Sequence, residues 1–226
     1  HRIPDIDTAL MEDWEEKLER IARQAVRANI TNLTGVPSWM LILLKRVLAI
    51  SGKKNISEVW PNLELYMHGG VNFEPYKTQF KTLIPSEKMN YLEGYNASEG
   101  FIGIQDKNPS EGLLLMLDYG IFYEFIPMKK YKKGIREAIP LKDVQLNTDY
   151  SLVISTNGGL WRYLIGDVVR FTSLSPFRIK IIGRTKSFLN AFGEELVVEN
   201  TDSALLAACS KYNASIKEYT VAPLFI

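Results

Sequence analysis

Six short apolar runs rich in β-prone residues lie between residues 101 and 182, and they constrain the fold more than any other feature. Glycine, proline, asparagine or aspartate separates each run from the next, which is typical of strands joined by turns. The pattern therefore predicts a sheet in the centre of the chain. The expected strands are Phe101–Ile104, Gly112–Leu117, Ile121–Ile126, Tyr150–Thr156, Tyr163–Phe171 and Phe177–Ile182.

Helical patterns flank the predicted strands on both sides. In the first of them, apolar residues recur every three or four positions between charged residues, which predicts an amphipathic helix. A second helix begins near Ser38 after Pro37 and stops at Gly52, since proline favours the first turn of a helix and glycine its end. The first helix is expected at Asp7–Ile30. Two more helices are expected at Glu74–Leu83 and Glu194–Tyr212, and a last strand at Ile216–Ile226.

The composition agrees with a mixed α/β protein that has a real core. The 226 residues are 46% hydrophobic and 23% charged, which excludes a disordered chain, a collagen and a coiled coil. A net charge of +1 gives no indication of a nucleic acid or membrane partner. The single cysteine, Cys209, cannot form an internal disulfide, so a reducing compartment, the cytoplasm, is expected.

Clusters of polar residues and glycine interrupt the apolar pattern where strands are expected to end, and ligands of α/β proteins usually bind there. In one cluster, paired glycines Gly69 and Gly70 allow a ligand to approach the backbone closely. In the next, Tyr95 can stack on a base, Ser98 can bond a phosphate, and Glu99 can hold Mg²⁺. A tight turn is the competing interpretation of the first cluster. A polar hairpin turn explains the second cluster about equally well.

Two further clusters occur later in the chain. Asp167 follows a glycine at a predicted strand edge, where an acidic residue can accept both hydroxyls of a ribose. Arg184 precedes the next helical segment and can reach a ribose or a phosphate. The competing interpretation of Asp167 is an ordinary aspartate in a β-turn.

Read together and in order, these segments resemble the adenylate-forming enzyme superfamily. Within it the chain is most similar to the auxin-responsive acyl-acid amido synthetase family, and to its bacterial-type members. The segments that carry the resemblance are Gly35–Met40, Val59–Leu63, His68–Gly70, Tyr95–Gly100, Phe122–Phe125, Tyr163–Val169 and Gly183–Lys186. They cover most of the chain.

The resemblance implies a ligase that uses ATP and Mg²⁺ in two steps. A small carboxylic acid first attacks the α-phosphate of ATP, which gives an acyl-adenylate and pyrophosphate. The amine of an amino acid then attacks the activated acyl carbon and releases AMP. Cationic groups and backbone donors are needed because two anions must approach each other and charge develops at phosphorus.

The resemblance also implies roles for individual residues. Tyr95 packs against the adenine, Ser98 lies beside the phosphate, and Glu99 binds Mg²⁺. Asp167 holds the ribose hydroxyls, and Tyr163 supports the nucleotide pocket.

Four more residues have implied roles. Arg184 contacts the ribose or phosphate, and Gly69 and Gly70 line the acyl pocket. Lys186 occupies the hinge about which the small domain rotates between the two steps. The implied fold is the central part of the adenylate-forming enzyme fold, with mixed sheets flanked by helices. Its divisions are the rest of the large N-terminal nucleotide- and acyl-binding domain (1–183), the hinge (184–187) and the truncated start of a small α+β C-terminal domain (188–226).

Two features of the family have no counterpart in the sequence. No glycine-rich, Ser/Thr-rich phosphate loop occurs before Thr31, and neither Lys211 nor Lys217 lies in a motif that matches the late lysine of the superfamily. The chain is therefore expected to be a fragment that binds nucleotide weakly. We expect no ATP–pyrophosphate exchange from these 226 residues alone.

Three other functions compete with this interpretation. The acceptor can instead be a thiol of CoA or of a carrier protein, although the segment Phe122–Phe125 favours the amide-forming branch. The basic cluster between Lys129 and Arg136 can indicate nucleic-acid binding, but a charge run between two strands is usually a solvated loop. A non-catalytic interaction module is the third alternative.

Overall fold

The computed structural model describes residues 2–107, 110–185, 188–191 and 194–212, together with 214, 216 and 219–222. The chain divides into two units, one of His1–Leu92 with Asn213–Tyr219 and one of Glu93–Tyr212 with Thr220–Ile226. Each unit has its own hydrophobic core. Strand β3, Asn90–Ala97, begins in the first unit and continues in the second.

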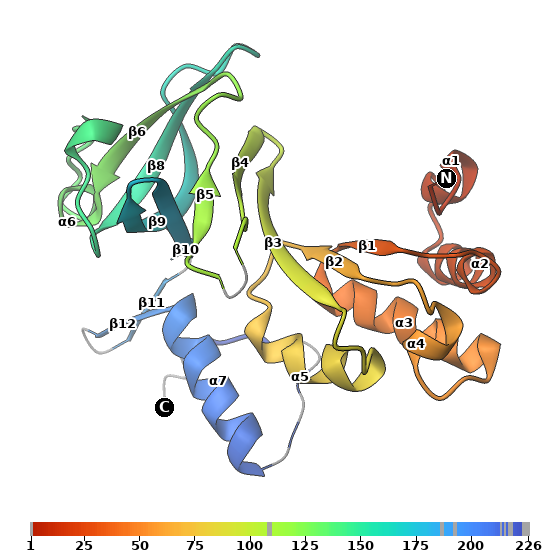
Figure 1. Ribbon diagram of the computed structural model, residues 1–226. Coiled ribbons are helices and arrows are strands. Elements are labelled where there is room, and N and C mark those ends of the chain that lie inside the picture. Colours follow the sequence, from red (N-terminus) through yellow and green to blue (C-terminus); the bar gives the residue numbers. More distant parts are fainter. Residues whose placement is uncertain are drawn as a thin grey trace. The chain divides into compact units, whose positions relative to one another are not determined.

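The first unit combines a parallel pair of strands with helices (Figure 1). Strand β1 pairs with β2 from Asn32 opposite Leu65 to Gly35 opposite His68. Parallel strands need a crossover connection, and the chain between them supplies one that contains two helices. The elements are α1 (Ile6–Ala9), α2 (Trp14–Val26), β1 (Asn32–Gly35), α3 (Pro37–Ser51), α4 (Ile56–Val59), β2 (Leu65–His68) and α5 (Glu74–Leu83).

The helix boundaries of this unit follow from the capping residues. Pro37 occupies the first turn of α3, and Gly52 ends the helix in a left-handed conformation with φ of 67°. The Asp13 side chain accepts the backbone N–H of Glu16 at 2.7 Å, so a new helix begins there. The predicted helix from Asp7 to Ile30 is therefore two helices, α1 and α2.

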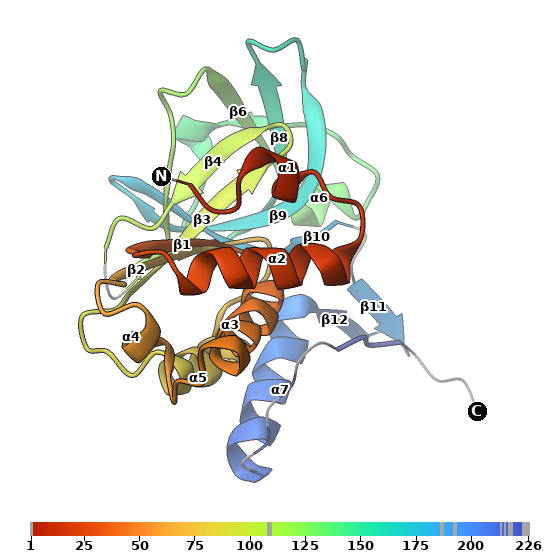
Figure 2. The same cartoon turned by 90° about the vertical axis from the view of Figure 1, so that its right-hand side faces the viewer.

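The second unit contains a sheet in which all neighbouring strands are antiparallel, in the order β3-β4-β5-β10-β9-β8-β6-β7. Strands β8, β9 and β10 run side by side in both Figure 1 and Figure 2. The remaining elements are β4 (Gly100–Ile104), β5 (Leu113–Leu115), β6 (Ile121–Pro127), α6 (Met128–Tyr131), β7 (Ile139–Pro140), β8 (Asp149–Thr156), β9 (Tyr163–Leu174), β10 (Phe177–Arg184), β11 (Phe188–Ala191), β12 (Glu194–Val197) and α7 (Val198–Tyr212).

The structure confirms the predicted mixed α/β class and the six central strands, and corrects the prediction for the last part of the chain. Glu194–Val197 is strand β12, paired with β11, so the predicted helix begins at Val198. Of the predicted strand Ile216–Ile226, the described residues 216 and 219–222 are in neither helix nor strand, and the others lie outside the described residues. Within the described ranges, no helix is long and apolar enough to cross a membrane.

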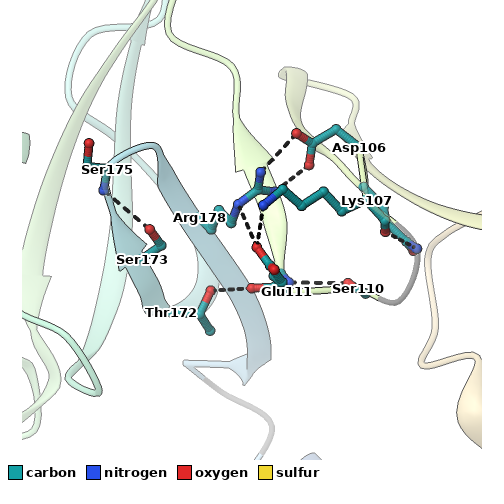
Figure 3. A network of polar contacts seen from close by, with 10 residues as sticks. Asp106, Lys107, Ser110, Glu111, Thr172, Ser173, Ser175 and Arg178 are labelled. Atoms are coloured by element: carbon teal, nitrogen blue, oxygen red, sulfur yellow. Dashed lines mark hydrogen bonds and ion pairs between the residues drawn. The ribbon is translucent and has the colours of Figure 1, made fainter.

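Replacing Gly112 with alanine is expected to destabilise the second unit by about 2 kcal/mol. Gly112 has φ of +109°, and a Cβ on it would lie 2.5 Å from Thr172 Oγ1 and 3.1 Å from the carbonyl oxygen of Ile179. The Thr172 hydroxyl also donates to the carbonyl of Glu111 at 2.8 Å, so it cannot move away freely (Figure 3).

The free energy of unfolding in urea measures this effect. Gly134 is the control, because its φ is also positive, +79°, but a Cβ there meets nothing within 4 Å. Gly134→Ala should therefore destabilise the protein less than Gly112→Ala. Equal losses in the two variants would show that backbone conformation, rather than crowding, determines the effect at Gly112.

Candidate functional site

Asp167 and Arg184 face each other across two paired strands of the second unit. They are partners in the register of β9 and β10, and Arg184 Nε lies 3.1 Å from Asp167 Oδ1. The glycine before the aspartate, Gly166, has φ of +87° and lies where β9 shifts register against β8. A bulge with a left-handed glycine redirects a strand locally, so this irregularity sets the position of the carboxylate.

Tyr95 joins this pair from β3. Its hydroxyl donates a hydrogen bond to Asp167 Oδ2 at 2.5 Å, and the residue is only 6% exposed. Burial and the neighbouring Asp167 charge raise the pKa of the Tyr95 hydroxyl well above its usual value. The tyrosine therefore keeps its proton and acts as a fixed donor to the carboxylate. The structure thus brings Tyr95, Asp167 and Arg184 together, a group that we call the Asp167 cluster.

Ser98 and Glu99 form the turn between β3 and β4. The serine is exposed and the glutamate is half-buried. The charge of Glu99 contributes to the raised pKa of Tyr95, although less than burial and Asp167 do. Among the described residues, the Glu99 carboxylate makes no hydrogen bond or ion pair. The turn thus presents a hydroxyl and a carboxylate three and four residues beyond Tyr95 on the same hairpin.

The remaining predicted site residues are Tyr163, Gly69, Gly70 and Lys186. Tyr163 begins β9, is 41% exposed and pairs in register with Ile154. Gly69 and Gly70 follow β2 in the first unit, where Gly70 has φ of +83°. Lys186, the predicted hinge residue, lies outside the described residues.

Backbone groups complete the Asp167 cluster, and the sequence did not indicate them. The carbonyl oxygen of Ile165 accepts a hydrogen bond from Arg184 Nη2 at 3.2 Å. The N–H of Thr185, which is buried, donates to the carbonyl of Gly166 at 2.8 Å. These bonds depend on the register between strands, so residue types and spacing alone could not have revealed them.

The arrangement leaves a carboxylate and a guanidinium available to a ligand. A carboxylate has about four acceptor sites, and Tyr95 and Arg184 occupy one on each oxygen of Asp167. The Asp167 side chain is 15% exposed and the Arg184 side chain 64% exposed. The cluster can therefore accept hydrogen bonds from vicinal hydroxyls and donate others to an anion next to them.

Two family models match successive parts of the chain. The model described as the GH3 family N-terminal domain matches residues 3–89, and that of the GH3 family central domain matches residues 114–184. Together they cover more than half of the 226 residues. The chain belongs to the GH3 family. The expected resemblance to auxin-responsive amido synthetases is confirmed.

Curated relatives agree with this assignment. The GH3 chain is 25% identical to the indole-3-acetic acid-amido synthetase GH3.3 of Arabidopsis thaliana, over 92% of this chain and 37% of the relative. It is 30% identical to the jasmonoyl-L-amino acid synthetase JAR6 of Nicotiana attenuata, over 51% of this chain and 21% of the relative. The chain therefore spans well under half the length of these relatives. Both are plant proteins, and the bacterial-type assignment stays a prediction.

Solved structures of adenylate-forming enzymes share the fold. The GH3 chain superposes on the GH3.15 acyl acid amido synthetase with a TM-score of 0.68 at 15% identity, over 89% of this chain and 46% of that chain. A 2-hydroxyisobutyryl-CoA ligase gives a TM-score of 0.63 at 15% identity, over 84% of this chain and 40% of that chain. The predicted adenylate-forming fold is thus confirmed.

Proposed function

We propose that the chain is part of an ATP-dependent ligase that adenylates a small carboxylic acid and transfers the acyl group to the amine of an amino acid. Membership of the GH3 family supports the reaction type. The observation that carries the proposal is the Asp167 cluster. Its carboxylate is held on both oxygens, by Tyr95 and by Arg184, and this arrangement favours a site for ribose hydroxyls over an ordinary aspartate in a β-turn. An amine is the favoured acceptor because the named GH3 relatives are amido synthetases.

The residues present fit a nucleotide with its metal ion. Asp167 would accept the ribose hydroxyls on its remaining acceptor sites, and Tyr95 and Arg184 hold the carboxylate in place. Mg²⁺ is usually bound through one or two carboxylates and the phosphates of a substrate. Glu99 can supply such a carboxylate, while the described residues contain no cluster of three or more metal-ligating side chains.

Each residue of the site would have a limited task in the reaction. Tyr95 remains a hydrogen-bond donor to Asp167 and so fixes the orientation of the carboxylate. The Arg184 guanidinium reduces negative charge next to the phosphates, and the Ser98 hydroxyl can donate to a phosphate oxygen. ATP supplies the electrophilic phosphorus. In the second step the amine nitrogen forms the amide bond, the bond from acyl carbon to AMP breaks, and one proton is released.

Replacing Asp167 with asparagine is expected to weaken the binding of AMP by about tenfold or more, because two charge-assisted hydrogen bonds to the ribose are lost. NMR titration of the chain can measure this even when binding is weak. The titration is repeated with 2′-deoxy-AMP. Loss of the hydroxyl should weaken binding to the native chain but have little further effect in the variant.

Asp149→Asn is the matched control for this experiment. Asp149 also pairs with an arginine across two strands of the same unit, and Arg170 Nε lies 2.6 Å from Asp149 Oδ1. The control should bind AMP as the native chain does. If Asp167→Asn and Asp149→Asn weaken the binding of AMP equally, Asp167 does not hold the ribose. The same conclusion follows if removal of the 2′-hydroxyl weakens binding to Asp167→Asn as much as it weakens binding to the native chain.

A further inference from the structure

Positive charge is concentrated at α6, the short helix that directly follows β6 in the second unit (Figure 1). Five of the chain's 27 lysine and arginine residues and one of its 26 acidic residues lie between Met128 and Glu137, so this segment has a net charge of +4 while the whole chain has +1. The near-neutral total conceals this difference. All five cationic residues are exposed, and we call them the α6 basic cluster: Lys129, Lys130, Lys132, Lys133 and Arg136.

The cluster is built on a hydrogen-bonded turn and not on an irregular loop. The N–H of Gly134 donates to the carbonyl of Tyr131 at 3.0 Å, and the N–H of Ile135 donates to the carbonyl of Lys130 at 3.1 Å. Together with the left-handed conformation of Gly134, whose φ is +79°, these bonds form a motif that commonly ends a helix. The cationic side chains therefore extend from fixed backbone positions, so less entropy is lost when they meet a partner.

Most of this charge has no anionic partner within the described ranges. Lys130 does pair with Glu137, with its Nζ atom 2.7 Å from Oε2. Lys129 and Lys133 make no hydrogen bond or ion pair with any residue that the structure describes. Arg136 Nη1 donates to two backbone carbonyls, at 2.7 and 3.5 Å, which leaves the guanidinium charge without a counter-ion there. Three positive charges thus remain unmatched in the described part of the segment.

A nucleic acid fits this cluster poorly. Proteins that bind single strands stack the bases on exposed aromatic rings, and Tyr131 is the one aromatic residue of the segment. The guanidinium carbon of Arg136 lies 3.7 Å from the centroid of the Tyr131 ring, so it covers one face, and the tyrosine is half-buried. A base therefore has no free ring face in full contact with solvent on which to stack. The four residues of α6 also give a helix too short to present a row of side chains to a groove.

An anionic lipid surface fits the cluster better. Groups of about four to eight lysine and arginine residues are typical of segments that bind acidic phospholipids. Ile135 lies at the end of the same turn and is 39% exposed. An apolar side chain among lysines can enter the headgroup region while the ammonium groups stay with the lipid phosphates. A bilayer also presents many anions in one plane, so several exposed cations can be matched at once.

We infer that the α6 basic cluster attaches the protein reversibly to a membrane surface rich in anionic phospholipid. Lys129, Lys133 and Arg136 would pair with headgroup phosphates and carboxylates, and Ile135 would insert between the headgroups. Such attachment is weak and sensitive to salt, because each cation contributes modestly and dissolved ions screen it. The inference goes beyond the proposed ligase activity and involves none of the residues of the Asp167 cluster.

The test is sedimentation of the chain with lipid vesicles at low salt. The partition coefficient should be at least about tenfold higher for vesicles of phosphatidylcholine mixed with phosphatidylserine than for vesicles of phosphatidylcholine alone. It should fall by about tenfold or more when the salt concentration rises from about 0.05 M to about 0.5 M. Soluble glycerophosphoserine has the same headgroup chemistry without a bilayer, and it should not displace the chain from the vesicles.

Variants at exposed positions test the individual contacts. Lys129→Gln/Lys133→Gln should lower the partition coefficient by about tenfold or more, since two cations near the surface are lost. Ile135→Ala should lower it several-fold through lost apolar contact. Lys53→Gln/Lys54→Gln is the matched control, because it removes the same charge from two exposed lysines of the first unit. This control should leave vesicle binding nearly unchanged.

Three results would overturn the inference. The first is an absence of binding to anionic vesicles at low salt, or equal binding to both vesicle compositions. The second is an equal loss in the two double variants, because binding would then follow the total charge and not the α6 basic cluster. The third is a single-stranded RNA that binds more tightly than the vesicles at equal phosphate concentration, which would make the cluster a nucleic-acid site. No ligase substrate takes part in these measurements, so the proposed function stands or falls separately.

Discussion

Replacing Asp106 with alanine is expected to destabilise the protein by about 3 kcal/mol, because it leaves a buried guanidinium without its partner. The Arg178 side chain on β10 is only 3% exposed, and its Nη2 donates to Asp106 Oδ2 at 2.9 Å while Nη1 donates to Oδ1 (Figure 3). The nearest other anion, Glu111, lies 3.9 Å from Arg178 Nε and is 59% exposed. The Asp106 side chain is 35% exposed, which keeps the expected loss at the lower end for a buried pair.

The pH dependence of stability should follow from the same pair. The hydrogen bond from Arg178 holds the pKa of the Asp106 carboxyl below its usual value of 3.8. The folded protein therefore binds this proton less readily than the unfolded chain does, so the stabilisation is complete above about pH 4 and is lost as the pH falls further.

Urea unfolding at neutral pH measures the effect of Asp106→Ala. Lys107→Ala is the matched control in the same network, since it removes an ion pair to Glu111 of 2.8 Å in which both side chains are more than half exposed, and its cost should be below about 1 kcal/mol. The double variant Asp106→Ala/Arg178→Met should be more stable than Asp106→Ala alone, because no charge remains buried. A double variant that is less stable would show that the pair contributes through packing instead.

Local signals predicted much of the fold. Pro37 and Gly52 set the ends of α3, and the periodicity from Glu74 to Leu83 predicted α5 with the bounds that the structure gives. These features act within a few residues of each other, so the sequence displays them directly.

Features that depend on distant partners were missed or wrong. Strand β3 was read only as a polar cluster, because Tyr95 becomes buried through Asp167, a residue 72 positions away. The pairing of β12 with β11 similarly determines the conformation of Glu194–Val197, whose residue types allow a helix as well.

The candidate site shows the same division. The residue types at Tyr95, Asp167 and Arg184 came from a motif resemblance, whereas their convergence depends on bulges that align Asp167 with Arg184. The exposure of two aromatic residues was not predicted at all. Phe122 lies in a predicted strand and Trp161 between two predicted strands, and only the fold shows that both face solvent. Exposure of an aromatic residue is a property of the tertiary structure, so a motif cannot reveal it.

The stability of the protein is expected to fall by about 3 kcal/mol between pH 6.5 and pH 4 because of His68 alone. This residue ends β2, is 5% exposed and stacks on Phe73 with ring centroids 4.1 Å apart. Its Nδ1 atom is buried without a hydrogen-bond partner among the described residues. Burial lowers the pKa of His68 from 6.5 to about 4, and the nearby charges of Glu74 and Lys77 act in opposite directions.

The sign of the effect follows from proton binding. Above pH 6.5 His68 is neutral in both states, so the folded state has its full stability. Between pH 6.5 and about 4 the unfolded chain takes up a proton that the folded protein does not, and each step down in pH favours unfolding. Below about pH 4 both states are protonated, and His68 causes no further loss.

Urea unfolding of the native chain and of His68→Phe at several pH values between 7 and 4 tests this prediction. Phenylalanine preserves a ring for stacking but cannot take up a proton, so the difference in unfolding free energy between the two proteins should change by about 3 kcal/mol over the range. The chain has one other histidine, His1, so the same measurement on His1→Gln shows how much of the change comes from that residue. Parallel curves for the native chain and His68→Phe would mean that His68 can accept a proton in the folded state, which would require water or a movement of β2 to reach its buried nitrogen.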